Sequence, residues 1–187
     1  MSKIEQSIDV GVPVRTAYNQ WTQFEEFPQF MEGVEKVQQL DDTTLHWIAE
    51  IGGQRREFAA KITEQIPDER VAWRADGEVA QAGVVTFHRI DENTTRVMLQ
   101  MEFEPSDWKE KAGDILGIVD ARIKGDLKRF KEFIEDEGYA TGAWRGSVAG
   151  GTVGTPTVAD AAASRGDDGK AGISGKAAAA GIGIAAA

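Results

Sequence analysis

The chain has 187 residues, of which 41% are apolar, enough for one globular domain and thin for two. Its formal net charge of −10 repels phosphate backbones and anionic lipid surfaces, so nucleic acid is excluded as an expected partner. Because it has no cysteine, the chain forms no disulfide and offers no thiolate metal site and no Cys nucleophile.

The predicted elements begin with a strand and two short helices. Ile4, Ile8 and Val10 alternate with polar residues, which is typical of a half-buried strand. Pro13 favours the start of a short helix, since its missing N–H is harmless in a first turn. The aromatic-rich segment 24–31, interrupted by a proline, fits a second short helix or turn. Strands separated by turn signals follow at 34–40, 44–51, 54–66, 71–75, 82–90 and 95–103.

One long helix over 108–137 is the last predicted element, because apolar residues recur there at steps of three or four. Gly113, Gly117 and Gly125 lie inside it, and each destabilises a helix by up to about 1 kcal/mol relative to Ala. These glycines indicate either a close approach of the helix to the sheet or a bend. The charged run 124–137 is typical of a solvated helix face.

A shift in composition after this helix separates a domain from a tail. All eight phenylalanines precede position 134, whereas residues 142–187 contain 11 Gly and 14 Ala. Such a segment cannot bury enough large side chains to offset the entropy of ordering it. We therefore predict one folded domain over 1–141 and a disordered, low-complexity tail over 142–187 that is dispensable for folding.

No targeting segment is recognisable in the sequence. The N-terminal residues enter a charged strand pattern and lack the apolar stretch of a signal peptide. The uncharged stretches of the tail are too short and too weakly apolar to span a bilayer. We expect a soluble, cytoplasmic protein without a transmembrane segment.

The balance of strands and helices predicts a cavity. Short connections between the strands favour an antiparallel sheet, and only one long helix is available to cover seven strands. Ala49, Ala60, Gly113 and Gly117 leave further space between that helix and the sheet. The predicted fold is therefore α+β, with a curved seven-stranded antiparallel sheet, two short helices and a long C-terminal helix that enclose an apolar cavity.

Five segments carry a family resemblance: V-P-V-R-T-A-Y-N-Q-W (12–21), F-E-E-F-P-Q-F-M (24–31), H-W-I-A-E-I-G-G (46–53), I-T-E-Q-I-P-D-E-R-V-A-W (62–73) and G-D-L-K-R-F-K-E-F-I (125–134). They resemble the SRPBCC superfamily, whose members have the START-like or Bet v 1-like helix-grip fold. Within it, the chain is similar to bacterial polyketide cyclase/dehydrase proteins and to coenzyme Q-binding proteins. The resemblance covers residues 2–138, and it implies the helix-grip fold and a shared pocket.

Apolar residues of the inner sheet face and of the long helix are candidates for ligand contact. Aromatic side chains in such positions are either plain core or cavity lining, and the shortage of covering helices leaves both open. The segment 24–31 either caps the cavity mouth or joins the short helices to the sheet. The candidate set is Trp47, Phe58, Ile62, Trp73, Phe87, Leu99, Met101, Leu116 and Gly117.

Three charged residues, Arg56, Glu64 and Arg89, share parity with the inner apolar residues of their strands. They either orient a ligand, act as acid–base groups in a pocket of low dielectric constant, or lie at strand ends where the pocket opens to water. Arg56 and Glu64 are separated by roughly 26 Å along an extended strand, so they do not form one catalytic dyad.

The two histidines, His46 and His88, lie with the polar residues of their strands, so we place both on the outer, exposed face of the sheet. A zinc site would need Asp or Glu partners, and neither HxxE nor ExxH spacing occurs. We therefore predict no metal site. The absence of nucleotide- and phosphate-binding motifs also predicts no cofactor.

Three functions remain open. The first is a binding module for a small hydrophobic molecule such as a polyketide, an isoprenoid quinone or a fatty acyl chain. The second, implied by the resemblance, is a polyketide cyclase, aromatase or dehydrase that acts on a poly-ketone chain. The third is a protein-interaction module, for which the net charge of −11 over residues 1–141 permits a basic protein partner. Convergent polar residues on the inner face would favour the enzyme, and a continuous apolar lining would favour the binding module.

Overall fold

The computed structural model describes residues 2–51, 53–75, 80–103, 112–146 and 148. Its element order is the predicted one, and the bounds agree closely with the sequence pattern except that the first residues of the predicted long helix, 108–111, lie outside the described residues. The elements are β1 (Ser2–Val10), α1 (Val14–Trp21), η1 (Phe24–Gln29), β2 (Val34–Gln39), β3 (Thr44–Ile51), β4 (Gln54–Ile66), β5 (Arg70–Ala75), β6 (Gln81–Asp91), β7 (Thr94–Phe103) and α2 (Ala112–Glu137).

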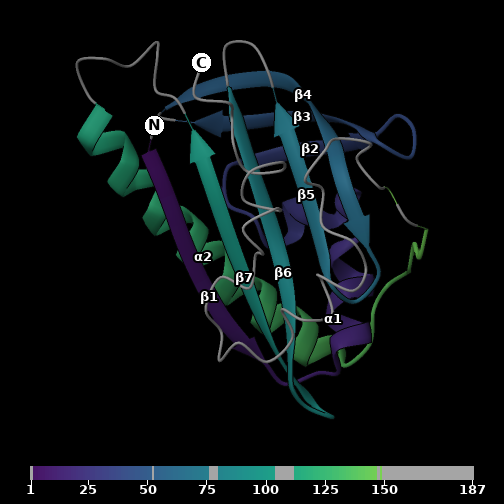
Figure 1. Cartoon of the computed structure of the whole chain (residues 1–187). Coiled ribbons are helices and arrows are strands. Elements are labelled where there is room, and N and C mark those ends of the chain that lie inside the picture. Colours follow the sequence, from purple (N-terminus) through teal and green to yellow (C-terminus); the bar gives the residue numbers. More distant parts are fainter. Residues whose placement is uncertain (1, 52, 76–79, 104–111, 147, 149–187) are drawn as a thin grey trace.

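The strands form one curved antiparallel sheet in the order β1-β7-β6-β5-β4-β3-β2. Strands β2 to β7 follow one another as a meander, and β1 joins the far edge by pairing with β7. Figure 1 shows α1 and α2 on the same side of this sheet, which we call the inner face. This is the predicted helix-grip α+β fold.

Helix α2 covers only part of the inner face. It packs along β1 at one edge of the sheet. There Leu116, Val119 and Ile123 contact a small buried cluster formed by Ile4 and Phe103. Because α2 lies against this edge, the inner face of β3 and β4 near the opposite edge has no long helix over it, and space for a cavity remains there.

The short helices supply the rest of the cover. Trp21 of α1, Phe27 of η1 and Phe30, which directly follows η1, have buried rings that pack against one another. Trp21 and Phe30 also pack against Phe130 of α2, each with 5.2 Å between the ring centroids. The segment 24–31 therefore does join the short helices to the core, which is one of the two roles considered for it.

The chain beyond α2 also packs against the domain. We call residues 139–146 and 148 the strap. The strap contacts the C-terminal end of α1. There the backbone N–H of Thr141 donates to the side chain of Gln20 at 2.8 Å, and the backbone N–H of Trp144 donates to the hydroxyl of Thr22 at 3.0 Å.

Arg145 and Val148 make three further contacts that hold the strap. The guanidinium of Arg145 donates to Asn19 and to Asp68, each at 2.7 Å. Val148 forms an antiparallel bridge with Gln65 of β4. The folded part therefore extends past the predicted boundary at 141, and the remainder of the predicted tail, 149–187, lies outside the described residues.

In the part of the chain that the structure describes, no helix is long and apolar enough to cross a bilayer.

Candidate ligand cavity

A cavity of about 180 Å³ lies between the inner face of the sheet, η1 and α2. An engineered apolar cavity of about 150 Å³ holds benzene, so this space accommodates one ring or a short chain. The cavity is partly open to solvent, which leaves a route for a longer ligand to extend outward.

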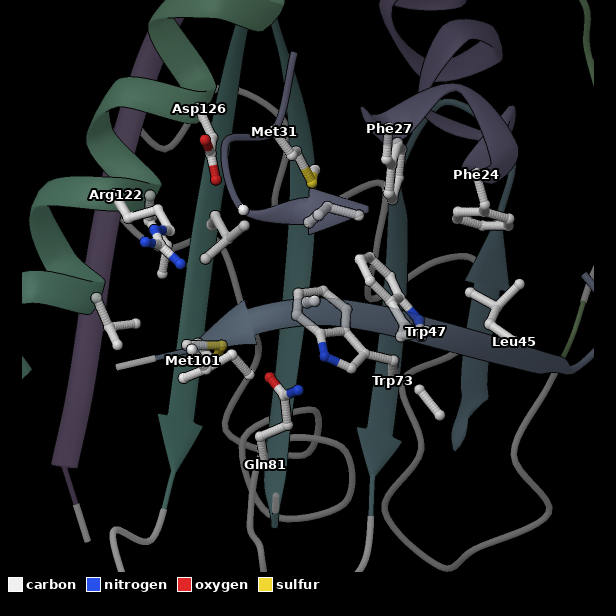
Figure 2. Close-up of a pocket in the computed structure, with 18 of the residues that line it drawn as sticks. Phe24, Phe27, Met31, Leu45, Trp47, Trp73, Gln81, Met101, Arg122 and Asp126 are labelled. Atoms are coloured by element: carbon white, nitrogen blue, oxygen red, sulfur yellow. The ribbon is translucent and has the colours of Figure 1, made fainter. Parts of the chain in front are cut away.

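The walls of the cavity are largely apolar. The rings of Trp47 and Phe58 stack across β3 and β4, with centroids 6.1 Å apart and planes 5° from parallel. Ala49 and Ala60 lie between larger residues on the same face and leave the hollow unfilled. Figure 2 shows Phe24, Phe27 and Met31 facing Trp47 and Trp73 across this space, so the aromatic segment 24–31 contributes to the cavity as well as to the core.

Half of the residues that the sequence singled out surround the cavity. The alternation of β3, β4, β5 and β7 directs them to the inner face, as the strand register shows. They are Trp47, Phe58, Ile62, Trp73, Leu99 and Met101.

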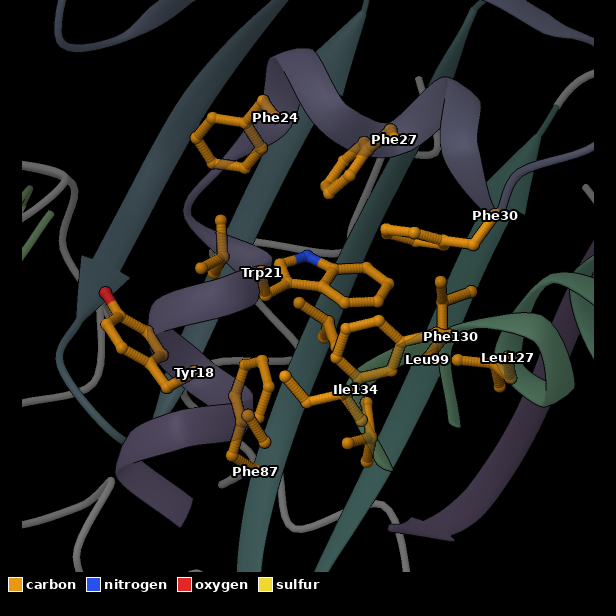
Figure 3. Packing of buried hydrophobic residues seen from close by; sticks show 14 of the residues in the cluster. Tyr18, Trp21, Phe24, Phe27, Phe30, Phe87, Leu99, Leu127, Phe130 and Ile134 are labelled. Atoms are coloured by element: carbon orange, nitrogen blue, oxygen red, sulfur yellow. The ribbon is translucent and has the colours of Figure 1, made fainter. Parts of the chain in front are cut away.

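Phe87 lies on the inner face but outside the cavity. Its side chain is 1% exposed and meets Tyr18 and Trp21 edge-on, with centroids 5.4 Å and 6.3 Å away. Figure 3 shows it at the α1 end of the core, among aromatic rings. Helix α1 covers this part of β6, so Phe87 is packed core, the alternative that the sequence pattern left open.

The two helix candidates also lie away from the cavity. Leu116 packs against Ile4 and Phe103 at the β1 edge. Gly117 is exposed, and a β-carbon placed on it would meet no atom within 4 Å. The part of α2 that lines the cavity begins at Val119 and includes Ile123 and Leu127, so both helix candidates lie N-terminal to it.

None of the three candidate charged residues lines the cavity. Arg56 lies at the β3–β4 hairpin, where its guanidinium donates to Gln54 at 2.8 Å. Arg89 is exposed near the C-terminal end of β6. Both residues therefore lie near strand ends, but Arg89 is at the opposite end of β6 from Gln81, which lines the cavity.

Glu64 lies on the outer face because β4 contains a bulge. The register shifts between Ile62 and Glu64, so that Ile62 pairs with Trp73 and Glu64 pairs with Ala72. One extra residue reverses the side-chain alternation of a strand. Glu64 is buried there beside Arg70, whose Nε lies 3.4 Å from its carboxylate.

The histidines differ in exposure. His46 is partly exposed, and its Nε2 lies 2.9 Å from the carboxylate of Glu57. His88 is on the outer face as predicted, but it is only 1% exposed and hydrogen-bonds to Thr86 at 2.9 Å. The expectation that His88 is solvent-exposed is wrong, since parity sets the face of a side chain and not its burial. Within the described residues, no group of three His, Asp or Glu side chains is placed to hold a metal ion.

The polar part of the cavity was missed from the sequence. Arg122 and Asp126 of α2 line the cavity on the same stripe as Val119 and Ile123. Figure 2 shows both charged side chains projecting from α2 toward the cavity. The available signal is that each lies three residues after one of these apolar neighbours. Asp126 falls within the charged run 124–137, which is typical of a solvated helix face, and Arg122 precedes that run.

These side chains join α2 to the cavity mouth. Arg122 donates to the backbone carbonyl of Glu50 at the end of β3. Asp126 accepts the backbone N–H of Glu32 at 2.9 Å and a guanidinium N–H of Arg129. Burial raises the pKa of Asp126 above its ordinary value, although the bonds from Arg129 and Glu32 act in the opposite direction. The mouth thus holds charged side chains of α2 beside a largely apolar space.

The sheet, the gripping helix and the cavity define a START-like helix-grip protein of the SRPBCC type. The chain matches the family model for polyketide cyclase / dehydrase and lipid transport over residues 10–132. It is also 63% identical over 149 residues to an uncharacterized 17.2 kDa protein of Streptomyces lincolnensis, a match that covers 79% of this chain and 99% of that protein. The chain belongs to the polyketide cyclase/dehydrase and lipid transport family.

Solved structures share this fold at low sequence identity. A Thermus thermophilus protein is 18% identical with a TM-score of 0.64, over 73% of this chain and 99% of that one. A Streptomyces aromatase/cyclase is 15% identical with a TM-score of 0.64, over 76% and 99% of the two chains. A Deinococcus radiodurans protein is 22% identical with a TM-score of 0.59, over 74% and 99%. At these identities the likeness establishes the fold alone.

Proposed function

We propose that this protein binds a small lipophilic molecule in the cavity between the sheet, η1 and α2. The observation that carries the proposal is the cavity itself, about 180 Å³ of space that is bounded by Trp47, Trp73 and Phe58 and that the side chains of the described residues leave unfilled. An empty apolar space gives up packing contacts, so it is favourable only when something else fills it. A hydrophobic molecule would gain the burial that the cavity walls lack.

Binding is favoured over catalysis by the distribution of polar groups. Cyclisation or dehydration of a poly-ketone chain needs an acid or base beside the reacting carbons. In the described residues, the charged side chains directed to the cavity come from Arg122 and Asp126 of α2, with Glu32 nearby, and Glu50 contributes its backbone carbonyl. Apart from Gln81, the rest of the lining is apolar, which suits a binding or carrier protein.

The test is binding of a neutral fluorescent probe, N-phenyl-1-naphthylamine, to the full chain. We expect saturable enhancement of fluorescence with native protein and its loss on unfolding in urea. Native mass spectrometry of the freshly purified protein, followed by organic extraction, would identify a retained ligand. Enhancement that occurs only at urea concentrations within the unfolding transition would contradict the proposal, because it would report exposed core rather than a native cavity.

A further inference from the structure

The guanidinium of Arg122 has unused hydrogen-bonding capacity at the cavity mouth. It carries five N–H donors, and one of its Nη1 hydrogens is used by the carbonyl of Glu50. Among the residues that the structure describes, no second acceptor is bonded to Arg122. Because Arg122 lines the cavity, its remaining donors are available to a molecule that enters there.

The charge of Arg122 is balanced by its surroundings. Asp126 lies one helical turn away on the same stripe, and Glu32 lies beside it in the cavity lining. Glu50 meets Arg122 through its backbone carbonyl, and its side chain alternates to the outer face of β3. Arg129 is the other cation, but it is already engaged by Asp126 and lies 3.6 Å from the carboxylate of Glu32. Two cations against two anions leave no net positive charge at the mouth, so a carboxylate entering there loses hydration without a net attraction to offset the loss, whereas a neutral carbonyl avoids most of that cost.

Resting on the proposed function, we propose that Arg122 is the hydrogen-bond donor for the polar end of the ligand, and that this polar end is a neutral carbonyl oxygen rather than a carboxylate. The ligand class is then an apolar ring or chain that terminates in a ketone, quinone, ester or amide. The volume of about 180 Å³ has room for a single ring beside Trp73 and Met101, and on this proposal its carbonyl is directed toward Arg122 of α2.

Three probes of similar size separate the effects of apolar burial, a neutral carbonyl and a carboxylate on binding. They are ethylbenzene, acetophenone and benzoate. Each is titrated against the full chain at neutral pH by displacement of N-phenyl-1-naphthylamine. We expect acetophenone to bind roughly threefold to tenfold more tightly than ethylbenzene, the range that one additional hydrogen bond supplies. Benzoate should bind more weakly than acetophenone.

Two variants assign the effect to the named residues. Arg122→Met should lower the affinity for acetophenone to that for ethylbenzene and leave ethylbenzene unchanged. Asp126→Asn keeps an oxygen acceptor for Glu32 and Arg129 but removes the charge, so it should raise benzoate affinity with little change for acetophenone. Arg55→Met is the matched control, since Arg55 is exposed, pairs with Glu35 and lies outside the cavity.

The outcomes distinguish this inference from the proposed function. If no probe binds the native protein, the proposed function fails. If ethylbenzene binds but acetophenone is not favoured, or Arg122→Met weakens all probes equally, the cavity binds ligands and Arg122 is only a structural contact. Benzoate binding more tightly than acetophenone to the unmodified chain would overturn the preference for a neutral carbonyl.

Discussion

The indole of Trp73 lies directly on the backbone of Gly83, its cross-strand partner on the inner face of the sheet. A β-carbon placed on Gly83 would sit 2.4 Å from Cζ2 of Trp73. No real side chain tolerates that distance, so this glycine is required for close approach. The contact holds the indole flat along the wall of the cavity and sets how much space remains above it.

Replacing Gly83 with Ala should therefore push the Trp73 indole into the cavity. We expect a loss of about 1–3 kcal/mol in the free energy of unfolding, as in other overpacked interiors, together with weaker binding of N-phenyl-1-naphthylamine. Urea denaturation and probe titration measure the two effects. Gly117→Ala is the control, because Gly117 is exposed and a β-carbon there meets no atom within 4 Å. Gly53→Ala is unsuitable, because Gly53 has a φ of 79°, at which any other residue is strained.

Enlarging Ala60 to Leu tests whether the cavity is real space. Ala60 is 2% exposed, lines the cavity and pairs with Leu45. In a true cavity the new side chain gains burial, so the free energy of unfolding should stay within about 1 kcal/mol of the unmodified value while probe affinity falls. Gly117→Leu, on the exposed side of α2, should leave probe affinity unchanged. A loss of stability in Ala60→Leu with intact binding would indicate a filled core and a probe site elsewhere.

Alternation along the strands made most of the inner face predictable. Trp47, Phe58 and Trp73 each alternate with the polar residues of their own strand, and the pairing of β3, β4 and β5 brings them to the same face. Glu64 escaped this reasoning because a bulge leaves no clear mark in a sequence, and one inserted residue moved it to the outer face.

The stripe of α2 was harder to predict than the sheet face. Periodicity puts Leu116, Val119 and Ile123 on one side of the helix, and all three contact the cluster of Ile4 and Phe103. Of these, Val119 and Ile123 also line the cavity, whereas Leu116 lies nearer the N-terminal end of α2. The docking of α2 along β1 decides how much of this side reaches the cavity, and that is a tertiary relationship. The same docking brings Arg122 and Asp126 to the cavity mouth, although their charge is typical of solvated positions.

The strap makes the predicted effect of truncation depend on where the chain is cut. Removing 149–187 should change the melting temperature little, because this Gly/Ala-rich segment has few large side chains to bury. Removing 140–187 should lower it by about 5 °C or more, since the bonds of Thr141, Trp144 and Arg145 to α1 and the β4–β5 turn are lost.

A single substitution supports the truncation experiment. Arg145→Ala removes the contacts with Asn19 and Asp68 and the packing of the guanidinium over the Tyr18 ring, 5.7 Å from its centroid. This substitution should reproduce part of the decrease in melting temperature that removal of 140–187 causes, as measured by differential scanning calorimetry. Equal melting temperatures for the two truncated chains would show that the strap contributes nothing to stability.

The outer face contains a buried carboxyl group that couples stability to pH. Burial raises the pKa of Glu64 to about 7 from its ordinary value of 4.5, and the nearby Arg70 only partly opposes this shift. Between those two values the folded protein keeps a proton that the unfolded chain has released. Stability therefore falls as pH rises through that window, because charging the buried carboxyl is unfavourable.

Glu64→Gln should remove this dependence. The free energy of unfolding of the unmodified chain should decline between pH 5 and pH 8 relative to that of the variant, by about 1–3 kcal/mol in total, since one unit of pKa shift corresponds to about 1.4 kcal/mol. Urea denaturation at matched ionic strength across this pH range measures the difference. Glu132→Gln, at an exposed position of α2, serves as the control, and its free energy of unfolding should change with pH as that of the unmodified chain does. If the free energy of unfolding of Glu64→Gln also changes with pH as that of the unmodified chain does, Glu64 is ionised throughout this pH range, and its pairing with Arg70 outweighs its burial.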